Sequence, residues 1–325
     1  MRSKSERKKQ LVNALCASAV SLVFAGTAAL ICRLCFNARA LTVFLIFVFV
    51  FAFVLGVLIF LWKKTDLLRK LIYLKYCMTH PKKARKFLCP CCNRTLAGFA
   101  DFGFGGDNER FDPERFKKQR QDVMCPFCYS APRQRILACW AEENKNLLKK
   151  SKILYFAPEY SMMKWFGRNG IDLTTADLFD KRADLKLDIT DVDLPDGTYD
   201  VVICNHVLEH VSSYEKALCE LNRILKPEGM LIVSFPIDTE LDGVLEREAK
   251  TPEERIRLFG QNDHVRLFGK DSGKMLASFG FTVGTIDVEG IPGSVLPVVG
   301  PADYDSNLIF ICRKISDTGN RGLEK

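Results

Sequence analysis

Residues 199–235 read YDVVICNHVLEHVSSYEKALCELNRILKPEGMLIVSF. The apolar run Tyr199–Cys204 predicts a buried strand, because a short continuous apolar segment suits a strand covered on both faces. A helical stretch follows, in which apolar residues recur at spacings of three and four: Leu208, Val211, Tyr214, Leu218, Leu221, Ile224 and Leu225. Lys226–Gly229 (KPEG) ends the helix, and Met230–Phe235 predicts a second strand. This order predicts two parallel strands of one sheet.

The same alternation continues on both sides of this stretch. Ile153–Ala157 and Leu173–Leu178 predict strands, and Tyr160–Phe166 predicts a helix between them. Phe281–Val288 and Leu308–Cys312 predict the last strands. The fold class is therefore α/β with a doubly wound parallel sheet, and such sheets bind ligands at the carboxyl ends of their strands.

Two runs without charge precede this domain, at residues 11–31 and 40–62. A bilayer core needs roughly 20 apolar residues in a helix, so the runs predict a transmembrane helical hairpin. The flanking basic residues place both termini in the cytoplasm under the positive-inside rule. The sequence thus predicts a multi-pass protein of the cell membrane with two spans, held in the lipid bilayer by these helices, with its main domain in the cytoplasm. A cleaved signal peptide is the alternative, but its apolar region would be too long.

The balance of charge also differs between the N-terminal segment and the rest of the chain. Of the 47 basic and 39 acidic residues, residues 1–86 hold 16 and 2, which leaves 31 against 37 in the remainder. Residues 63–86 predict a basic amphipathic helix, lying on anionic lipid or serving as a charged linker, that ends before Pro81. The net acidic remainder disfavours nucleic acid as a partner, because phosphate binding needs clustered Lys and Arg.

Four of the 13 cysteines form two Cys-x2-Cys pairs: Cys89, Cys92, Cys125 and Cys128. Each tight turn can point two thiolates at one ion, so the pairs predict a small zinc ribbon with a structural zinc ion. Cys91 is left over. Unligated thiols are the alternative.

Taken in order, these features resemble the class I S-adenosylmethionine-dependent methyltransferase superfamily. The matching parts are the strand Tyr199–Cys204, the segment His206–Val211, the turn Leu225–Gly229 and the strand that follows. A narrower, methyltransferase type 11-like group also shows the turn Phe156–Glu159 (FAPE), the segment Phe259–Arg266 (FGQNDHVR) and paired cysteines upstream. The resemblance covers about residues 89–315. It implies a Rossmann-like methyltransferase sheet and S-adenosylmethionine as cofactor.

The resemblance also implies roles for individual residues. Glu159 would meet the amino group of the methionine moiety, and Asp177 would accept hydrogen bonds from both ribose hydroxyls. Asp188 with Ile189 would flank the adenine, and Asn205 would line the cleft. In isolation, Asp177 would be a turn aspartate and Asp188 a solvated loop residue. The implied cofactor-binding residues are Ala157, Pro158, Glu159, Asp177, Leu178, Asp188, Ile189 and Asn205.

Methyl transfer from a sulfonium needs positioning more than covalent help, but a hydroxyl acceptor would need a base. His206 and His264 are the predicted catalytic residues for that step. His210 is interpreted as structural; it forms an i, i+4 pair with His206 that could hold a metal, although no third ligand is evident nearby. The polar insert at 238–271 predicts a lid or acceptor pocket, with a solvated helical face as the alternative for part of it. Its predicted substrate-binding residues are Gln261, Asp263 and Arg266.

The sequence thus predicts five segments: a basic tail with two transmembrane helices (1–62), a linker (63–86), a zinc-ribbon-like segment (87–149), a methyltransferase domain (150–315) and a disordered tail (316–325). The predicted function is a membrane-anchored methyltransferase that uses S-adenosylmethionine on an unidentified acceptor near the inner membrane face. The alternatives are a catalytically inactive methyltransferase-like membrane scaffold and an RNA methyltransferase.

Overall fold

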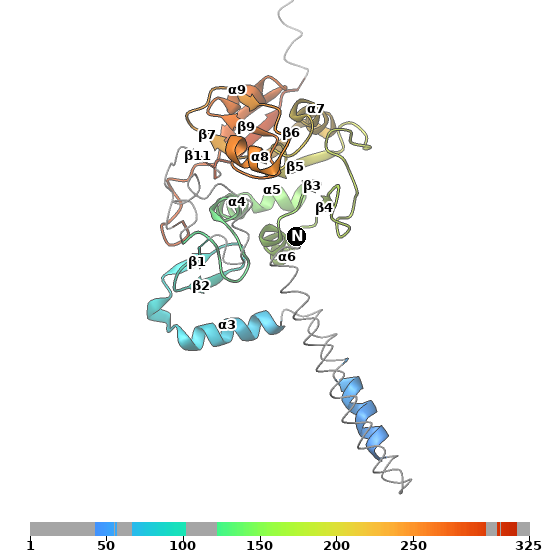
Figure 1. Ribbon diagram of the computed structural model, residues 1–325, viewed down its shortest axis with the longest axis vertical. Helices are drawn as coiled ribbons and strands as arrows, with labels where there is room; N and C mark the ends of the chain where they lie inside the picture. The colour runs from blue at the N-terminus through green and yellow to red at the C-terminus, as the bar shows by residue number, and fades with distance from the viewer. Residues whose placement is uncertain are drawn as a thin grey trace, which may run out of the picture. The chain divides into compact units, whose positions relative to one another are not determined.

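A computed structural model of the protein describes residues 43–54, 56, 67–101, 122–296, 304–305 and 307–316 (Figure 1). The chain divides into two compact units, Met1–Thr79 and His80–Lys325. In the first unit, residues 43–54 are helical and α3 spans Leu67–Thr79. α3 ends before Pro81, as its sequence predicts, because proline cannot donate the hydrogen bond that would continue a helix.

The predicted multi-pass membrane localisation is wrong. Among the described residues, no helix is long and apolar enough to cross a membrane. The first predicted span, residues 11–31, lies outside the described residues, as do residues 317–325 of the predicted disordered tail. The expectation of a transmembrane hairpin in a lipid bilayer is corrected accordingly.

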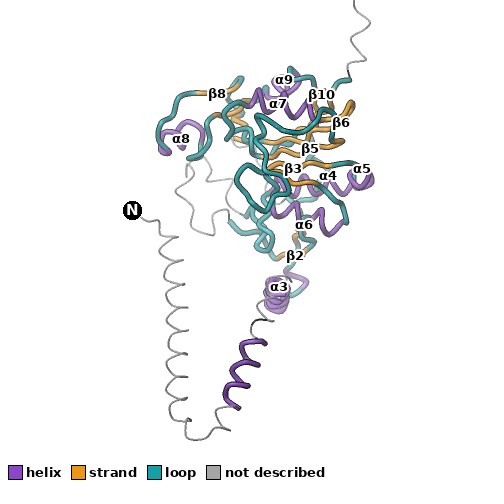
Figure 2. The backbone as a smooth tube through the Cα atoms, turned by 90° about the vertical axis from the view of Figure 1, so that its right-hand side faces the viewer, coloured by secondary structure: helices purple, strands orange, loops and turns teal. Residues whose placement is uncertain are grey.

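A six-stranded sheet forms the centre of the second unit, with the strand order β10-β12-β6-β5-β3-β4. Its strands are β3 (Ile153–Phe156), β4 (Thr174–Ala176), β5 (Tyr199–Asn205), β6 (Leu225–Ser234), β10 (Phe281–Thr285) and β12 (Phe310–Lys314). β4, β3, β5 and β6 run parallel, and β12 is antiparallel to both β6 and β10. Figure 2 shows β3, β5 and β6 side by side. The predicted α/β fold with a central sheet is confirmed, but the expectation of a parallel sheet holds only for β4, β3, β5 and β6, because β12 runs antiparallel to its neighbours.

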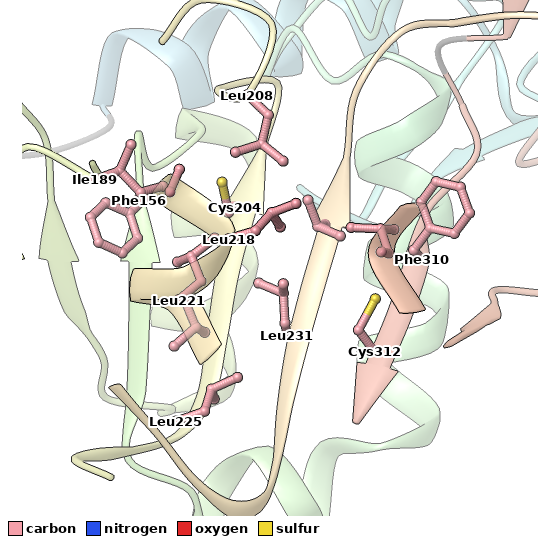
Figure 3. Packing of buried hydrophobic residues seen from close by; sticks show 14 of the residues in the cluster. Phe156, Ile189, Cys204, Leu208, Leu218, Leu221, Leu225, Leu231, Phe310 and Cys312 are labelled. Atoms are coloured by element: carbon pink, nitrogen blue, oxygen red, sulfur yellow. The ribbon is translucent and has the colours of Figure 1, made fainter. Parts of the chain in front are cut away.

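Helices cover both faces of this sheet. They are α4 (Pro132–Glu143), α5 (Lys145–Lys150), α6 (Tyr160–Asn169), α7 (Tyr214–Ile224) and α9 (Ser272–Ala277), whereas α8 (Pro252–Phe259) lies in the insert between β6 and β10. Successive residues of a strand point to opposite faces. Tyr155 of β3 contacts Phe166 of α6, with ring centroids 6.3 Å apart. Its neighbour Phe156 instead packs in a buried cluster with Leu218 and Leu221 of α7 (Figure 3), where each side chain contributes about 1.5–3 kcal/mol of burial free energy.

The segment between β5 and β6 differs from its prediction at both ends of the helix. α7 begins at Tyr214 and not near Leu208, because Ser213 caps it: the Ser213 hydroxyl accepts a hydrogen bond from the Lys216 backbone N–H at 3.2 Å. Leu208 is nevertheless fully buried, so its place in the apolar pattern indicates contact with the core and not helical structure. β6 already begins at Leu225, and its pairing with β5 shifts register before Met230.

A second sheet lies in the insert that the sequence predicts as a polar lid or pocket. It has the order β11-β7-β9-β8; β7 (Ile237–Asp238), β8 (Val244–Glu246) and β9 (Arg266–Gly269) come from the insert, and β11 (Tyr304–Asp305) joins them from a later part of the chain. Phe259 and Leu267 form its small buried cluster. Gly269 is required there, since a Cβ atom would lie 2.3 Å from the Leu241 carbonyl oxygen.

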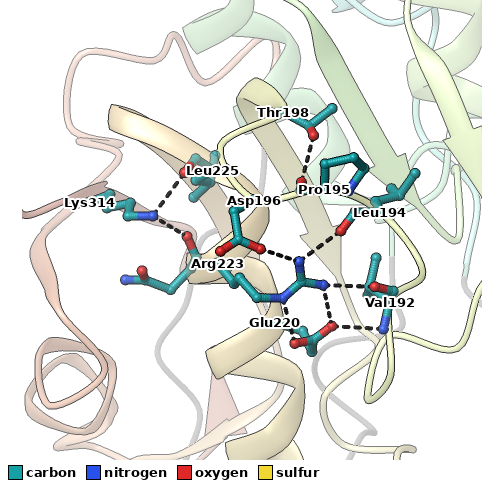
Figure 4. A network of polar contacts seen from close by, with 10 residues as sticks. Val192, Leu194, Pro195, Asp196, Thr198, Glu220, Arg223, Leu225 and Lys314 are labelled. Atoms are coloured by element: carbon teal, nitrogen blue, oxygen red, sulfur yellow. Dashed lines mark hydrogen bonds and ion pairs between the residues drawn. The ribbon is translucent and has the colours of Figure 1, made fainter.

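An arginine network closes the sheet at the amino end of β5 (Figure 4). The Arg223 guanidinium of α7 donates to the backbone oxygens of Val192 and Leu194, both at 2.7 Å. It also pairs with Asp196 at 2.6 Å and Glu220 at 2.7 Å. These bonds hold the loop before β5 onto α7, at the edge of the sheet opposite the strand ends where ligands bind.

Candidate active site

Two non-glycine residues with positive φ mark the carboxyl edge of the sheet. Strand order reverses between β3 and β5, and Ala157 (φ 47°) follows β3 while His206 (φ 53°) follows β5. The left-handed conformation costs such residues roughly 1–2 kcal/mol, and strain of this kind concentrates at functional sites. Backbone bonds hold both turns, from Ala157 N to Ala176 O at 2.8 Å and from His206 N to Ser234 O at 2.7 Å. This topological switch point is the candidate site.

Glu159, the predicted partner of the methionine amino group, already has protein partners. Its carboxylate accepts hydrogen bonds from Arg133 Nη2 and from the Tyr155 hydroxyl, both at 3.1 Å, and also from Gln134 Nε2. Burial, and next the charge of Glu159, raise the pKa of Tyr155 well above its usual value, so the phenol stays a neutral donor. Arg133 and Gln134 lie on α4, so the segment after the second cysteine pair reaches the candidate site, a role the sequence analysis missed.

Asp177 follows β4, the strand beside β3. Its Oδ1 accepts the backbone N–H groups of Phe179 at 2.7 Å and Asp180 at 2.8 Å, which is the turn arrangement expected for this residue type. Leu178 and Phe179 are exposed, at 38% and 87%. A half-buried carboxylate thus stands beside two exposed apolar side chains at the same sheet edge as Ala157.

The remaining predicted cofactor residues lie in three different environments. Asp188 is exposed, and its Oδ1 accepts from the Thr190 N–H and hydroxyl, both at 2.8 Å. Ile189 is buried in the hydrophobic core (Figure 3). Asn205 is buried at the end of β5, and its Oδ1 accepts from the Ser234 hydroxyl at 2.9 Å. Asn205 therefore lies at the switch point, and the Ile189 side chain belongs to the core.

A buried carboxylate, Glu209, lies beside the predicted catalytic residue His206. Its Oε1 is 3.1 Å from His206 Nδ1, and the side chain is 1% exposed. Burial acts to raise the pKa of Glu209, but the hydrogen bond to His206 and the nearby His264 and His210 outweigh it and hold the pKa at about 2. The carboxylate is therefore ionised and orients the His206 ring. The sequence analysis missed Glu209, although it stands inside the quoted segment 206–211.

His264, the second predicted catalytic residue, is brought to the same place from the insert. Its ring centroid lies 4.7 Å from that of His210. Burial lowers the pKa of His264 to about 4, which leaves the imidazole neutral at pH 7 and a weak base. His210 is half-buried, and its Nδ1 lies 3.2 Å from the Asp263 backbone oxygen.

The three predicted substrate-binding residues do not form one surface. Gln261 and Asp263 bond each other at 2.7 Å, and Asp263 is exposed. Arg266 is 2% exposed and donates to the backbone oxygens of Leu208 at 2.7 Å, Val211 at 2.5 Å and Ser212 at 3.2 Å. It also pairs with Glu246 of β8 at 2.6 Å. Arg266 therefore fixes the loop after β5 onto the second sheet.

The four paired cysteines come together as the sequence predicts. The Sγ atoms of Cys89 and Cys128 are 3.5 Å apart and those of Cys92 and Cys125 are 3.8 Å apart, and all four lie within 4.8 Å of one another. Four thiolates on zinc at about 2.3 Å would be separated by about 3.8 Å along each edge of the tetrahedron, so the arrangement fits a zinc ion. Cys91 instead points its thiol at the Gln134 backbone oxygen, 3.3 Å away.

Both cysteine turns share one backbone geometry. In each, the residue after the second cysteine has positive φ, at Asn93 (55°) and Tyr129 (59°), and its N–H bonds the carbonyl of the first cysteine. β1 (Phe87–Cys89) and β2 (Arg94–Leu96) form the hairpin around the first turn. Arg168 of α6 then donates to the Cys91 and Pro90 oxygens, both at 2.8 Å, which joins the ribbon to the methyltransferase-like sheet.

Comparison with known proteins identifies the central domain. Residues 162–233 match the family described as "Methyltransferase domain". No curated protein matches the sequence. This match over residues 162–233 supports the resemblance to the class I S-adenosylmethionine-dependent methyltransferase superfamily.

Similar solved structures include the [4+2]-cyclase SpnF, with 16% identity, 55% of this chain and 80% of that chain covered, and a TM-score of 0.38. Another is the 1,6-didemethyltoxoflavin-N1-methyltransferase of Burkholderia thailandensis with bound 1,6-didemethyltoxoflavin and S-adenosylhomocysteine (14% identity, 56% and 78% covered, TM-score 0.37). A third is a SAM dependent methyltransferase from Archaeoglobus fulgidus (14% identity, 56% and 94% covered, TM-score 0.38).

Proposed function

We propose that this protein transfers a methyl group from S-adenosylmethionine to an acceptor bound at the carboxyl edge of β3, β4 and β5. The observation that carries the proposal is the family match over residues 162–233, which runs from α6 through β6 and so includes the loops after β4 and β5. The strained turns at Ala157 and His206 support the same location.

The residues at this edge fit the cofactor. S-Adenosylmethionine, when bound, supplies an electrophilic methyl group. Asp177 would hold the ribose hydroxyls with its carboxylate, and the exposed Leu178 and Phe179 would flank the apolar part of the ligand. The turn Ala157–Glu159 approaches the methionine end, where Glu159 would share its carboxylate between Arg133 and the ligand amine.

His206 fits the role of base better than His264. Its Nδ1 faces the ionised Glu209, and its Nε2 is buried with no hydrogen-bond partner among the described residues. A hydroxyl acceptor would give its proton to this nitrogen while its oxygen forms the new bond to the methyl carbon. S-Adenosylmethionine, when bound, would supply this methyl group and would keep the electron pair of the broken carbon–sulfur bond, so the step balances.

The test is calorimetric titration of S-adenosylmethionine and S-adenosylhomocysteine into the full chain. We expect saturable binding of both, and Asp177→Ala should weaken it by roughly 10- to 100-fold, because a charge-assisted bond of about 1.5–3 kcal/mol is lost. Asp184→Asn is the matched control: this exposed carboxylate also bonds β4 backbone, through Thr175 at 2.9 Å, but is not among the predicted cofactor-binding residues. Absence of binding to folded protein would refute the proposal.

A second candidate is a methyltransferase domain without transfer activity. The three protein donors already on Glu159 favour it, because they occupy the carboxylate that the cofactor amine would need. The same titration separates the two: binding of neither ligand, with the fold intact, leaves the inactive domain.

We also propose that the four paired cysteines hold a structural zinc ion. Four thiolates fill a tetrahedral zinc, which leaves no open position for a substrate, so the ion stabilises the fold and takes no part in the reaction. The S···S distances of 3.5 and 3.8 Å support this assignment.

A further inference from the structure

A second group of metal-ligating side chains lies apart from the cysteines, where the insert meets the loop after β5. Glu209, His210 and His264 each offer one ligand atom, and these atoms lie within 4.8 Å of one another. Two imidazoles and one carboxylate are a common ligand set for divalent first-row metals. When the three ligands occupy one side of the ion, further coordination positions stay open.

The two histidines are oriented as metal ligands usually are. His264 Nδ1 lies 3.2 Å from the Phe259 backbone oxygen, and His210 Nδ1 lies 3.2 Å from that of Asp263. A carbonyl oxygen only accepts, so each Nδ1 carries the proton and each Nε2 keeps its lone pair. Metal-bound histidines almost always donate their second ring N–H in this way, which fixes ring orientation.

Glu209 supplies the second, independent observation. Its side chain is 1% exposed; His206 Nδ1 lies 3.1 Å from Oε1, while Oε2 has no hydrogen-bond partner within the described part of the chain. A buried carboxyl oxygen left without a partner is unfavourable unless a donor or a cation satisfies it. His206 Nδ1 approaches only Oε1, so this carboxylate retains capacity for a cation.

The backbone around the three residues is held in place before any ion binds. The Val265 N–H donates to the Glu209 backbone oxygen at 3.0 Å, which ties the insert to the loop after β5. Arg266 bonds the carbonyls on both sides of Glu209, at Leu208 and Val211. A preorganised ligand set loses little entropy on binding.

We propose that Glu209, His210 and His264 bind one divalent first-row transition-metal ion, separate from the cysteine site. His210 is the ligand nearest solvent, with 31% of its side chain exposed, so the ion enters there and keeps open positions on that side. The nitrogen and oxygen donors of this site favour harder metal ions than the thiolates of the cysteine site do.

The experiment is a Mn²⁺ titration of the full chain followed by electron paramagnetic resonance of free Mn²⁺. Mn²⁺ suits the test because thiolates bind it poorly, so the cysteine site does not compete. We expect saturation at one Mn²⁺ per chain, and Glu209→Gln and His210→Gln should each weaken binding at least 10-fold. Asp263→Asn is the matched control, since its carboxylate lies 3.8 Å from His210 Nδ1 but outside the ligand set, and it should bind Mn²⁺ as the wild type does.

Two results would overturn the site. One is a wild-type chain that leaves Mn²⁺ free; the other is a folded Glu209→Gln or His210→Gln chain that binds Mn²⁺ like the wild type. Either outcome would mean that Glu209, His210 and His264 form only a structural contact network, in which His206 is the partner of the Glu209 carboxylate. His210→Gln keeps the test valid if Glu209→Gln fails to fold, because His210 is half-buried. The titration needs no S-adenosylmethionine, so its result does not depend on the proposed function.

Discussion

At the scale of single residues, Ala157 carries strain that glycine would not. Its φ of 47° is left-handed, while its backbone N–H is fixed to Ala176. Ala157→Gly should therefore raise the free energy of unfolding by about 1 kcal/mol, because glycine adopts this conformation without the Cβ penalty. Chemical denaturation measures the change. Ala176→Gly, a buried strand position, should lower stability, and the same sign for both variants would contradict the argument.

The residue scale also shows how much of the site the sequence could predict. Cys89, Cys92, Cys125 and Cys128 were found by spacing alone, because each local turn dictates where two thiols point. Glu209 and His264 meet only because the insert folds back onto the loop after β5, which no local pattern encodes. The available signal in the sequence was an acidic residue, Glu209, between His206 and His210. The cofactor and substrate assignments stay predictions.

At the scale of elements, the loop before β5 depends on α7 through Arg223 and Glu220 (Figure 4). The hydrogen bond from Arg223 lowers the pKa of Glu220. A depressed carboxyl pKa stabilises the fold above the unfolded value of about 4.3, and the contribution is lost as pH falls through the lower folded value. Glu220→Gln should cost about 1 kcal/mol at pH 7 and flatten the decline of stability below pH 4.3.

Denaturant unfolding between pH 7 and pH 3 gives the comparison. Glu228→Gln is the control, since this exposed carboxylate lies in the bulge of β6, outside the network. An unchanged slope in Glu220→Gln would show that the ion pair contributes nothing.

Element boundaries were harder to predict than element types. The strands β3, β5 and β6 were predicted within a few residues, since buried parallel strands are continuous apolar runs. The start of α7 was misplaced because Leu208 faces the core from a loop. The second sheet was missed because β7, β8, β9 and β11 are two to four residues long and lie in a polar segment.

At the scale of the whole His80–Lys325 unit, the cysteine ribbon is built into the methyltransferase domain. Arg135 is fully buried and donates to the oxygens of Val123 and Ser130 at 2.8 Å and of Val295 at 2.9 Å. The Leu88 N–H bonds the Ser294 oxygen at 2.9 Å. These bonds reach from both cysteine turns to the far end of the chain, and α4 then reaches Glu159. Loss of the metal ion should therefore disturb the structure of the candidate site.

Zinc removal tests this coupling directly. Incubation of the full chain with a strong chelator should lower Tm by several degrees, because the binding free energy of a structural zinc ion is also folding free energy. Cys92→Ser should lose the zinc, measured by elemental analysis, and show the same lower Tm without chelator. Cys91→Ser should retain the zinc, since that thiol donates to the Gln134 backbone oxygen and is not one of the four clustered cysteines. If the zinc ion does not stabilise the fold, chelation will leave both Tm and S-adenosylmethionine binding unchanged. If α4 transmits the loss of zinc to Glu159, Tm and the binding affinity will fall together.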